Sequence, residues 1–223
     1  MSRVETIGRA ILHLGDCRDV LPTLPRVDAV VTDPPYGISH SSNHGASWQR
    51  TSISNDDSTE VRDWVAEWAG ERPAVFFGTW KTPPVSNARA CVVWNKGPAS
   101  GMGDLSLPWK PSFELVYLCG QGWQGRRGEG VITGPTMITW ESAGRVHPHQ
   151  KPEWLMAHFI ERAPEAQVIL DPFMGSGSTG CAAVAMGRDF IGCEIDAAYY
   201  DIACRRIEQA QRQGDFFIEG AAA

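Results

Sequence analysis

Three common features are missing from the sequence. No apolar run reaches the ~18 residues that a membrane-spanning helix requires. No two of the six cysteines have the close spacing of a zinc or redox site. The first 25 residues intersperse arginine with acidic residues, unlike the basic, apolar, small-residue order of a secretory signal. We therefore expect a cytoplasmic protein with reduced cysteines, no membrane anchor and no metal site.

The remaining composition is that of an ordinary globular protein. The 223 residues are 43% hydrophobic and 21% charged, and they include 23 Gly and 15 Pro. A chain of this length can bury a substantial core without help from disulfides or metals. It contains no internal repeat or low-complexity tract. One domain covering residues 1–223 is expected.

Charge is distributed unevenly along the chain. The formal net charge is −6, which argues against indiscriminate binding of nucleic acid. Residues 81–151 nevertheless hold 8 Lys and Arg against 4 Asp and Glu, a balance of +4. We expect any polyanion to contact this middle third of the chain.

Short apolar runs alternate with helical patterns. The expected strands cover residues 10–14, 29–32, 74–77, 91–94, 114–118, 168–170 and 190–193, and several are apolar throughout. Apolar residues recur at helical spacing within residues 61–68, 155–159, 181–186 and 202–207. This alternation predicts an α/β fold, in which a mostly parallel sheet carries helices on both faces.

Two long segments are expected to be loops with a function. Residues 37–56 are rich in Ser, Gly and Asn, and residues 120–147 are rich in Gly and contain Arg126 and Arg127 side by side. Loops longer than ~12–15 residues inside a compact domain are usually functional or disordered. A solvated linker is the alternative for the second segment.

The tetrapeptide Asp33-Pro34-Pro35-Tyr36 directly follows the apolar run at 29–32. Its two prolines make the turn stiff, because each ring fixes φ and Pro35 restrains Pro34. An exocyclic amine on a nucleobase is a poor nucleophile, since its lone pair is delocalised into the ring. The Asp33 carboxylate and the Pro34 carbonyl can accept hydrogen bonds from such an amine and stabilise its developing positive charge. Tyr36 offers a flat face on which the base can stack. Taken alone, the string is equally compatible with an ordinary turn.

A glycine-rich segment follows the apolar run at 168–170. Gly175, Gly177 and Gly180 have the Gly-x-Gly-x-x-Gly spacing, which lets the backbone approach a ligand at a helix N-terminus. Glu194 ends the next expected strand, where an acidic side chain can accept hydrogen bonds from a ribose. No Lys follows the glycines, so a phosphate-binding P-loop is not expected. A dinucleotide and an adenosyl ligand both remain open.

Together these motifs resemble the DNA amino-methyltransferases, which methylate exocyclic amines with S-adenosylmethionine. The order is that of their β class, with Asp-Pro-Pro-Tyr first, a target-recognition segment in the middle and the cofactor motif near the C-terminus. The resemblance extends over AVVTDPPYG, VVWNKG, FELVYL, HPHQKPEWL, DPFMGSGSTGCAA and FIGCEIDAAYYDIACRRI. It implies a single Rossmann-like methyltransferase domain with a short target-recognition insertion at about residues 120–147.

The resemblance also implies roles for individual residues. Asp33, Pro34 and Tyr36 would hold an everted base. The residues that would bind the cofactor are Asp16 and Cys17 at the adenine, Glu194 at the ribose, Lys151 at the methionine carboxylate, and Asp171, Phe173, Gly175, Ser176, Gly177 and Ser178 along the methionine and sugar. His149 stands where the family more often has Thr. In the middle segment, Arg126 and Arg127 are the leading candidates for contact with phosphate or guanine.

The expected activity is transfer of a methyl group from S-adenosylmethionine to the N6 amine of adenine in DNA, in a prokaryotic or phage-encoded protein. Asp in the first position of the tetrapeptide favours adenine in this family, whereas Ser would favour cytosine. The alternatives are N4-cytosine methylation by the same chemistry, a DNA- or cofactor-binding protein without turnover, and a nicotinamide enzyme. DNA is the expected partner, and a homodimer and a restriction-enzyme partner are left open.

Overall fold

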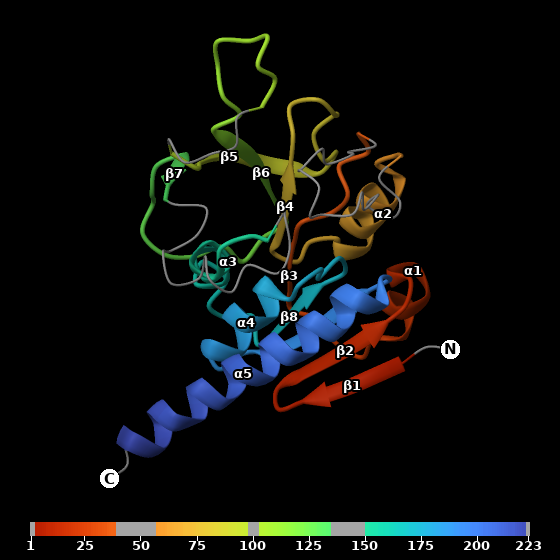
Figure 1. Cartoon of the computed structure of the whole chain (residues 1–223), viewed down its shortest axis with the longest axis vertical. Helices are drawn as coiled ribbons and strands as arrows, with labels where there is room; N and C mark the ends of the chain where they lie inside the picture. Colours follow the sequence, from red (N-terminus) through yellow and green to blue (C-terminus); the bar gives the residue numbers. More distant parts are fainter. Residues whose placement is uncertain (1–2, 39–56, 98–102, 135–149, 222–223) are drawn as a thin grey trace.

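A nine-stranded sheet forms the centre of the described structure (Figure 1). The computed structural model describes residues 3–38, 57–97, 103–134 and 150–221, with side chains as far as residue 213. The strand order in the sheet is β1-β2-β9-β8-β3-β4-β6-β5-β7. The strands are β1 (Arg3–Ile7), β2 (Ala10–Leu14), β3 (Ala29–Thr32), β4 (Ala74–Gly78), β5 (Ala88–Asn95), β6 (Phe113–Cys119), β7 (Val131–Thr133), β8 (Val168–Asp171) and β9 (Asp189–Glu194). The helices are α1 (Cys17–Val20), the 3-10 helix η1 (Leu21–Thr23), α2 (Glu60–Ala69), α3 (Glu153–Ile160), α4 (Ser178–Ala185) and α5 (Ala197–Ala221).

The central strands of the sheet run parallel. In the order β2, β9, β8, β3 and β4, each strand pairs in parallel with the next. At one side β1 joins β2 antiparallel, and at the other β6 is antiparallel to both β4 and β5. The mostly parallel sheet that the sequence predicts is therefore confirmed. Because β6 runs in reverse, its first residues lie at the same edge of the sheet as the carboxyl ends of β3 and β4.

Helices cover both faces of the sheet, as the sequence predicts. Successive side chains of a strand point to opposite faces. Val31 and Phe77 therefore pack with α3, α4 and α5, whereas their neighbours Val30 and Phe76 pack with α1 and α2. Figure 1 shows α3, α4 and α5 grouped on one side, with α2 apart from them. The two apolar layers hold the strand ends in fixed positions. Among the described residues, no helix is long and apolar enough to cross a membrane.

Two edge strands have no counterpart in the sequence prediction. β1 pairs with β2 from Arg3↔Leu14 to Ile7↔Ala10, and β7 pairs with β5 over three residues. β7 lies inside residues 120–147, so the prediction of a continuous loop there is wrong. A strand of three residues is determined by the partner it joins more than by its own sequence. Of the predicted loops, residues 39–56 and 135–147 lie outside the described residues.

Candidate active site

A cleft of about 860 Å³ opens at the edge of the sheet where the parallel strands end. Adjacent parallel strands bring residues that are distant in the sequence to one such edge. The segments that follow β2, β9, β8, β3 and β4 all contribute to its wall, as does the start of β6. The predicted site residues that line it are Asp16, Cys17, Asp33, Pro34, Tyr36, Lys151, Asp171, Phe173, Gly175, Ser176, Ser178 and Glu194.

The Asp33 carboxylate lies at the end of β3 and has a partner on each oxygen. Its Oδ1 accepts a hydrogen bond from the Tyr36 hydroxyl at 2.8 Å, and its Oδ2 lies 2.6 Å from Lys151 Nζ. Burial raises the pKa of Tyr36 well above its ordinary value, and the Asp33 charge adds to the rise. Tyr36 therefore stays protonated and acts as the donor in this pair.

Lys151 contacts two carboxylates at once. Besides Asp33, its ammonium lies 3.1 Å from Glu114 Oε2, and the side chain is almost fully buried. Burial alone would lower the pKa of Lys151, but the two carboxylates outweigh it and raise the pKa. The sequence prediction paired Lys151 with the methionine carboxylate of the cofactor. That assignment stays a prediction, and in the structure the ammonium is paired with the two partly buried carboxylates of Asp33 and Glu114.

Glu114 belongs to the site but is missed by the sequence prediction. Its carboxylate also lies 3.2 Å from Lys96 Nζ, so two ammonium groups face it. Burial raises the pKa of Glu114, but the charges of Lys151 and Lys96 outweigh that effect and lower it. At Asp33 burial prevails and raises the pKa, although Lys151 opposes the rise. A charged residue within the otherwise apolar segment FELVYL is the sequence signal that could have revealed Glu114.

The other end of the cleft is built around Glu194, at the end of β9. Its two oxygens accept hydrogen bonds from the backbone N–H groups of Gly175 at 2.9 Å and Asp196 at 2.8 Å. Burial raises the pKa of Glu194. Gly175 has φ 50°, in the left-handed region that favours glycine. The glycine-rich turn after β8 is thereby tied to the neighbouring strand end.

Three consecutive residues of this turn play different parts. Arg206 of α5 donates to the Ser176 carbonyl at 2.5 Å and to its hydroxyl at 3.1 Å. The sequence predicts that Gly177 contacts the cofactor, but Gly177 is not among the residues that line the cleft. It has φ 83°, and a Cβ there would lie 3.1 Å from Ala203, so the residue shapes the turn against α5. The Ser178 hydroxyl is buried in the cleft wall and has no hydrogen-bond partner among the described residues.

Asp171, at the end of β8, lies beside the last residue of β3. Its Oδ1 accepts hydrogen bonds from the Thr32 hydroxyl at 2.6 Å and from the backbone N–H of Phe173 at 3.1 Å. The residue is only 3% exposed. Burial raises the pKa of Asp171 to about 6.

Asp16 and Cys17 follow β2 at the far end of the cleft. The Asp16 carboxylate caps α1 by accepting from the backbone N–H of Arg18 at 2.9 Å, and it also pairs with the Arg18 guanidinium. Hydrogen bonding to Arg18 lowers the pKa of Asp16. Burial raises the pKa of Cys17 to about 12, so its thiol is neutral.

Arg126 and Arg127 do not line this cleft. Both are exposed and lie in the segment before β7, where the Arg126 carbonyl accepts a hydrogen bond from Arg162 at 2.8 Å. Their contact with DNA stays a prediction. His149 lies outside the described residues.

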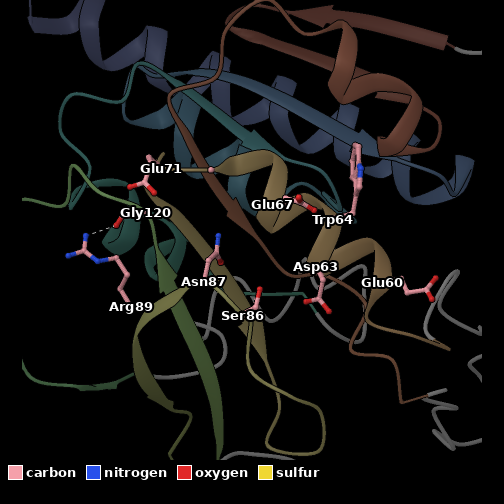
Figure 2. A pocket seen from close by; sticks show the side chains of 10 residues that line it. Glu60, Asp63, Trp64, Glu67, Glu71, Ser86, Asn87, Arg89 and Gly120 are labelled. Carbon is pink, nitrogen blue, oxygen red and sulfur yellow. Dashed lines mark hydrogen bonds between the residues drawn. The ribbon is translucent and has the colours of Figure 1, made fainter.

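A second hollow, of about 800 Å³, lies beside α2 (Figure 2). Its acidic side chains, among them Glu60, Asp63 and Glu71, are spread along and beyond the helix in Figure 2 and do not converge on one point. Arg89 donates to the Gly120 carbonyl at 2.8 Å. None of the predicted site residues contributes to this hollow, so the chemistry is assigned to the cleft.

The fold and the cleft define a Rossmann-like methyltransferase, in which a glycine-rich turn and an acidic strand end face a proline-bounded carboxylate. A family model described as DNA methylase matches residues 108–205. The putative methylase YubD of Escherichia coli K12 is 30% identical over 238 residues, which cover 93% of this chain and 97% of that protein. The chain therefore belongs to the DNA methylase family, the N6 and N4 amino-methyltransferases.

Other relatives agree with this assignment. The type II methyltransferase M2.DpnII of Streptococcus pneumoniae is 41% identical over 85 residues, 38% of this chain and 32% of that protein. The structure of M1.HpyAVI in complex with S-adenosylmethionine matches with a TM-score of 0.64 at 21% identity, over 87% of this chain and 98% of that one. The cytosine-N4-specific PvuII DNA methyltransferase matches with a TM-score of 0.64 at 16% identity, over 94% and 93%. Both structures share the fold.

Proposed function

We propose that the protein transfers a methyl group from S-adenosylmethionine to the N6 amine of adenine in DNA. The observation that carries the proposal is the single cleft that Asp33 and Tyr36 line together with the glycine-rich turn and Glu194. Membership of the N6 and N4 DNA methylase family gives the reaction class and counts against a nicotinamide enzyme. The choice of adenine rests on Asp33 at the first position of the tetrapeptide.

The Glu194 end of the cleft fits S-adenosylmethionine, the methyl donor of this family. Glu194 has lone pairs left for ribose hydroxyls after its two backbone contacts. The unpartnered Ser178 hydroxyl supplies one more polar group in the cleft wall. Asp16 and Cys17 would border the adenine. When bound, the donor supplies a methyl group attached to a positively charged sulfur.

The Asp33 end supplies acceptors for the attacking amine. The Asp33 carboxylate and the Pro34 carbonyl would accept hydrogen bonds from the two N–H groups of the amine and stabilise the positive charge that develops on its nitrogen. Preorganised groups of this kind contribute on the order of several kcal/mol to lowering a barrier. Lys151 and Tyr36 hold the carboxylate from the side, at 2.6 Å and 2.8 Å. They fix its orientation, and Lys151 favours its ionised form.

DNA must deliver its base into the cleft for this chemistry. An adenine inside a duplex is shielded by pairing and stacking, so it has to rotate out at a cost of a few kcal/mol. The ring of Tyr36 offers a stacking face beside Asp33. Holding the amine against the donor then removes much of the remaining entropic barrier. The proton leaves the nitrogen after transfer, to water, because an ionised Asp33 is a weak base.

The experiment uses amplified DNA, which carries no methylation, with the protein and S-adenosylmethionine labelled in its methyl group. Digestion to nucleosides should place the label in N6-methyldeoxyadenosine. Label in N4-methyldeoxycytidine would instead support the cytosine alternative, which the same acceptors could serve. Binding of S-adenosylhomocysteine without any transfer would support a protein that lacks turnover. We further propose a cytoplasmic location, where the DNA of a prokaryotic cell lies. Sedimentation tests whether the protein is a homodimer, which the sequence leaves open.

A further inference from the structure

All four lysines of the chain line the cleft. The sequence contains Lys only at positions 81, 96, 110 and 151, and each contributes to the cleft wall. Lys96 and Lys151 pair with Glu114. Lys81 and Lys110 are exposed and form no ion pair with any residue in the described part of the chain. Two unneutralised positive charges therefore stand at the mouth of the cleft in a protein whose formal charge is −6.

Two tryptophans stand next to these lysines. Trp80 is 72% exposed and Trp109 is 78% exposed, and Leu107 beside them is also exposed. All three line the cleft. Large apolar side chains gathered at this exposure usually mark a binding surface. We call the surface formed by Trp80, Lys81, Leu107, Trp109 and Lys110 the rim.

The topology places the rim at the Asp33 end of the cleft. Trp80 comes just after β4, and Trp109 and Lys110 come just before β6. Since β4 and β6 are antiparallel neighbours and β4 lies beside β3, both segments emerge at the edge where Asp33 lies. In Figure 1 the yellow-green segment between β5 and β6 projects beyond the sheet.

The segment that carries Trp109 is internally braced. Asp104 Oδ1 accepts hydrogen bonds from the Ser106 backbone N–H at 2.9 Å and from its hydroxyl at 2.7 Å. Pro108 and Pro111 flank Trp109 and Lys110 and restrict the backbone on both sides. The backbone that carries Trp109 and Lys110 is therefore restricted, which lowers the entropy cost of binding through these two side chains.

We propose that the rim contacts DNA around the everted base, an inference that rests on the proposed function. Trp80 and Trp109 pack against the bases that lose their neighbour when the target rotates out, because an aromatic ring replaces the lost stacking. Lys81 and Lys110 bind the flanking phosphates. Arg126 and Arg127, which the sequence favours for this role, lie outside the cleft wall.

Charge favours DNA over a second copy of the chain as the occupant. A two-fold symmetric contact through the rim would bring the same patch of both subunits together. Lys81 and Lys110 of each copy would then face their own equivalents, and like charges held together in an interface are unfavourable. A polyanion with exposed base faces complements both the lysines and the tryptophans.

The test measures binding of a short fluorescent duplex with one mismatched adenine, which rotates out easily. Trp80→Ala and Trp109→Ala should each weaken binding by about tenfold, within the range for loss of one base–aromatic stack. Trp80→Phe and Trp109→Phe keep a ring and should lose less. The pair Lys81→Ala/Lys110→Ala should make the dependence of log affinity on log salt shallower by about 1.8, since each phosphate contact contributes about 0.9. The pair Arg26→Ala/Arg212→Ala removes the same charge from exposed positions outside the cleft and should leave the slope unchanged.

Four further readouts separate the possible failures. Circular dichroism and S-adenosylhomocysteine affinity should match the wild type in every variant, because the rim is exposed. If the wild type methylates amplified DNA while the rim variants bind and methylate as well as it does, the rim inference is wrong. It is equally wrong if the variants only lose self-association in sedimentation. A wild type that transfers no methyl group to DNA would instead overturn the proposed function.

Discussion

The two ends of the cleft stabilise their carboxylates in different ways. At the Glu194 end, Glu194 and Asp171 accept hydrogen bonds from neutral backbone N–H groups and the Thr32 hydroxyl. At the Asp33 end, Asp33 and Glu114 face the ammonium groups of Lys151 and Lys96. Glu194 and Asp171 are therefore held by backbone and hydroxyl dipoles, whereas Asp33 and Glu114 face full positive charges; Asp16, farther along the cleft, is paired with the Arg18 guanidinium.

This difference fits what each end would bind under the proposed function. A cationic methyl donor is favoured by carboxylates whose negative charge is not already neutralised by a cation. The target amine arrives on a polyanion, so lysines at that end offset the repulsion between DNA phosphates and Asp33. The neighbouring lysines lower the pKa of Glu114, and Lys151 opposes the rise that burial causes in the pKa of Asp33. Within the residues that the structure describes, no cation opposes burial at Asp171, and its pKa rises to about 6. The following predictions test the contrast.

The largest effect is expected from Asp33→Asn. The amide keeps the shape of the side chain but removes the negative charge that faces the amine. We expect the rate of methyl transfer to fall by about 10²–10³-fold, the usual cost of losing one preorganised electrostatic contact. Lys151 keeps Glu114 as a partner, so the fold and the affinity for S-adenosylhomocysteine should be preserved. Single-turnover transfer and calorimetry measure the two quantities, and a parallel loss of both would contradict the division of the cleft.

Asp171→Asn tests the Glu194 end through stability. A carboxyl with pKa about 6 in the folded protein and ~4 in the unfolded chain binds its proton more tightly when folded. The free energy of unfolding therefore decreases as pH rises from ~4 through about 6, by up to ~3 kcal/mol. The variant lacks this ionisation, so it should be more stable than the wild type at pH 7 and similar to it at pH 4. Urea unfolding at both pH values measures the difference. If the difference in the free energy of unfolding between the variant and the wild type does not change with pH, burial of the Asp171 charge does not cause that difference.

Glu194→Gln should affect the cofactor alone. A hydrogen bond to a charged group is worth ~1.5–3 kcal/mol, so affinity for S-adenosylhomocysteine should fall by about 10- to 150-fold. DNA binding should change little, because Glu194 lies at the other end from Asp33. Glu67→Gln, a carboxylate in the hollow beside α2, is the matched control. If the Glu194 variant keeps its affinity for S-adenosylhomocysteine, Glu194 does not bind the ribose hydroxyls of the cofactor.

The Glu194 end could be predicted from the sequence because its parts are local. The turn from Asp171 to Ser178 is continuous, and Glu194 ends the next strand. The Asp33 end depends on long-range contacts. Lys151 and Asp33 are 118 residues apart, and Glu114 and Tyr36 are 78 apart. No spacing rule joins such pairs, since the order of β3, β4 and β6 in the sheet decides which side chains meet.

The fold shows the same limit. Central strands such as β3 and β4 are almost entirely apolar and fully buried, so the sequence predicts them within a residue of their observed ends. Edge strands β1 and β7 mix polar and apolar residues, and pairing with a neighbour fixes them. The charge count predicts that a polyanion contacts residues 81–151, and all four lysines of the cleft come from this segment. It could not show which of its cations face the cleft.

The smallest and most diagnostic effect concerns the acid side of the pH profile. Under the proposed function transfer requires an ionised Asp33, so we expect the rate to fall as pH drops through the pKa of that carboxyl. The Lys151 charge lowers the pKa of Asp33 and the Glu114 charge raises it. Lys151→Gln should therefore move the acid limb to higher pH, and Glu114→Gln should move it to lower pH. Lys96→Gln contacts Glu114 but not Asp33 and serves as the control. The pH dependence of the single-turnover rate measures the acid limb of all three variants. Simple loss of structure would shift the acid limb of the Lys151 and Glu114 variants in the same direction. Only opposite shifts therefore show that Lys151 and Glu114 tune the pKa of Asp33.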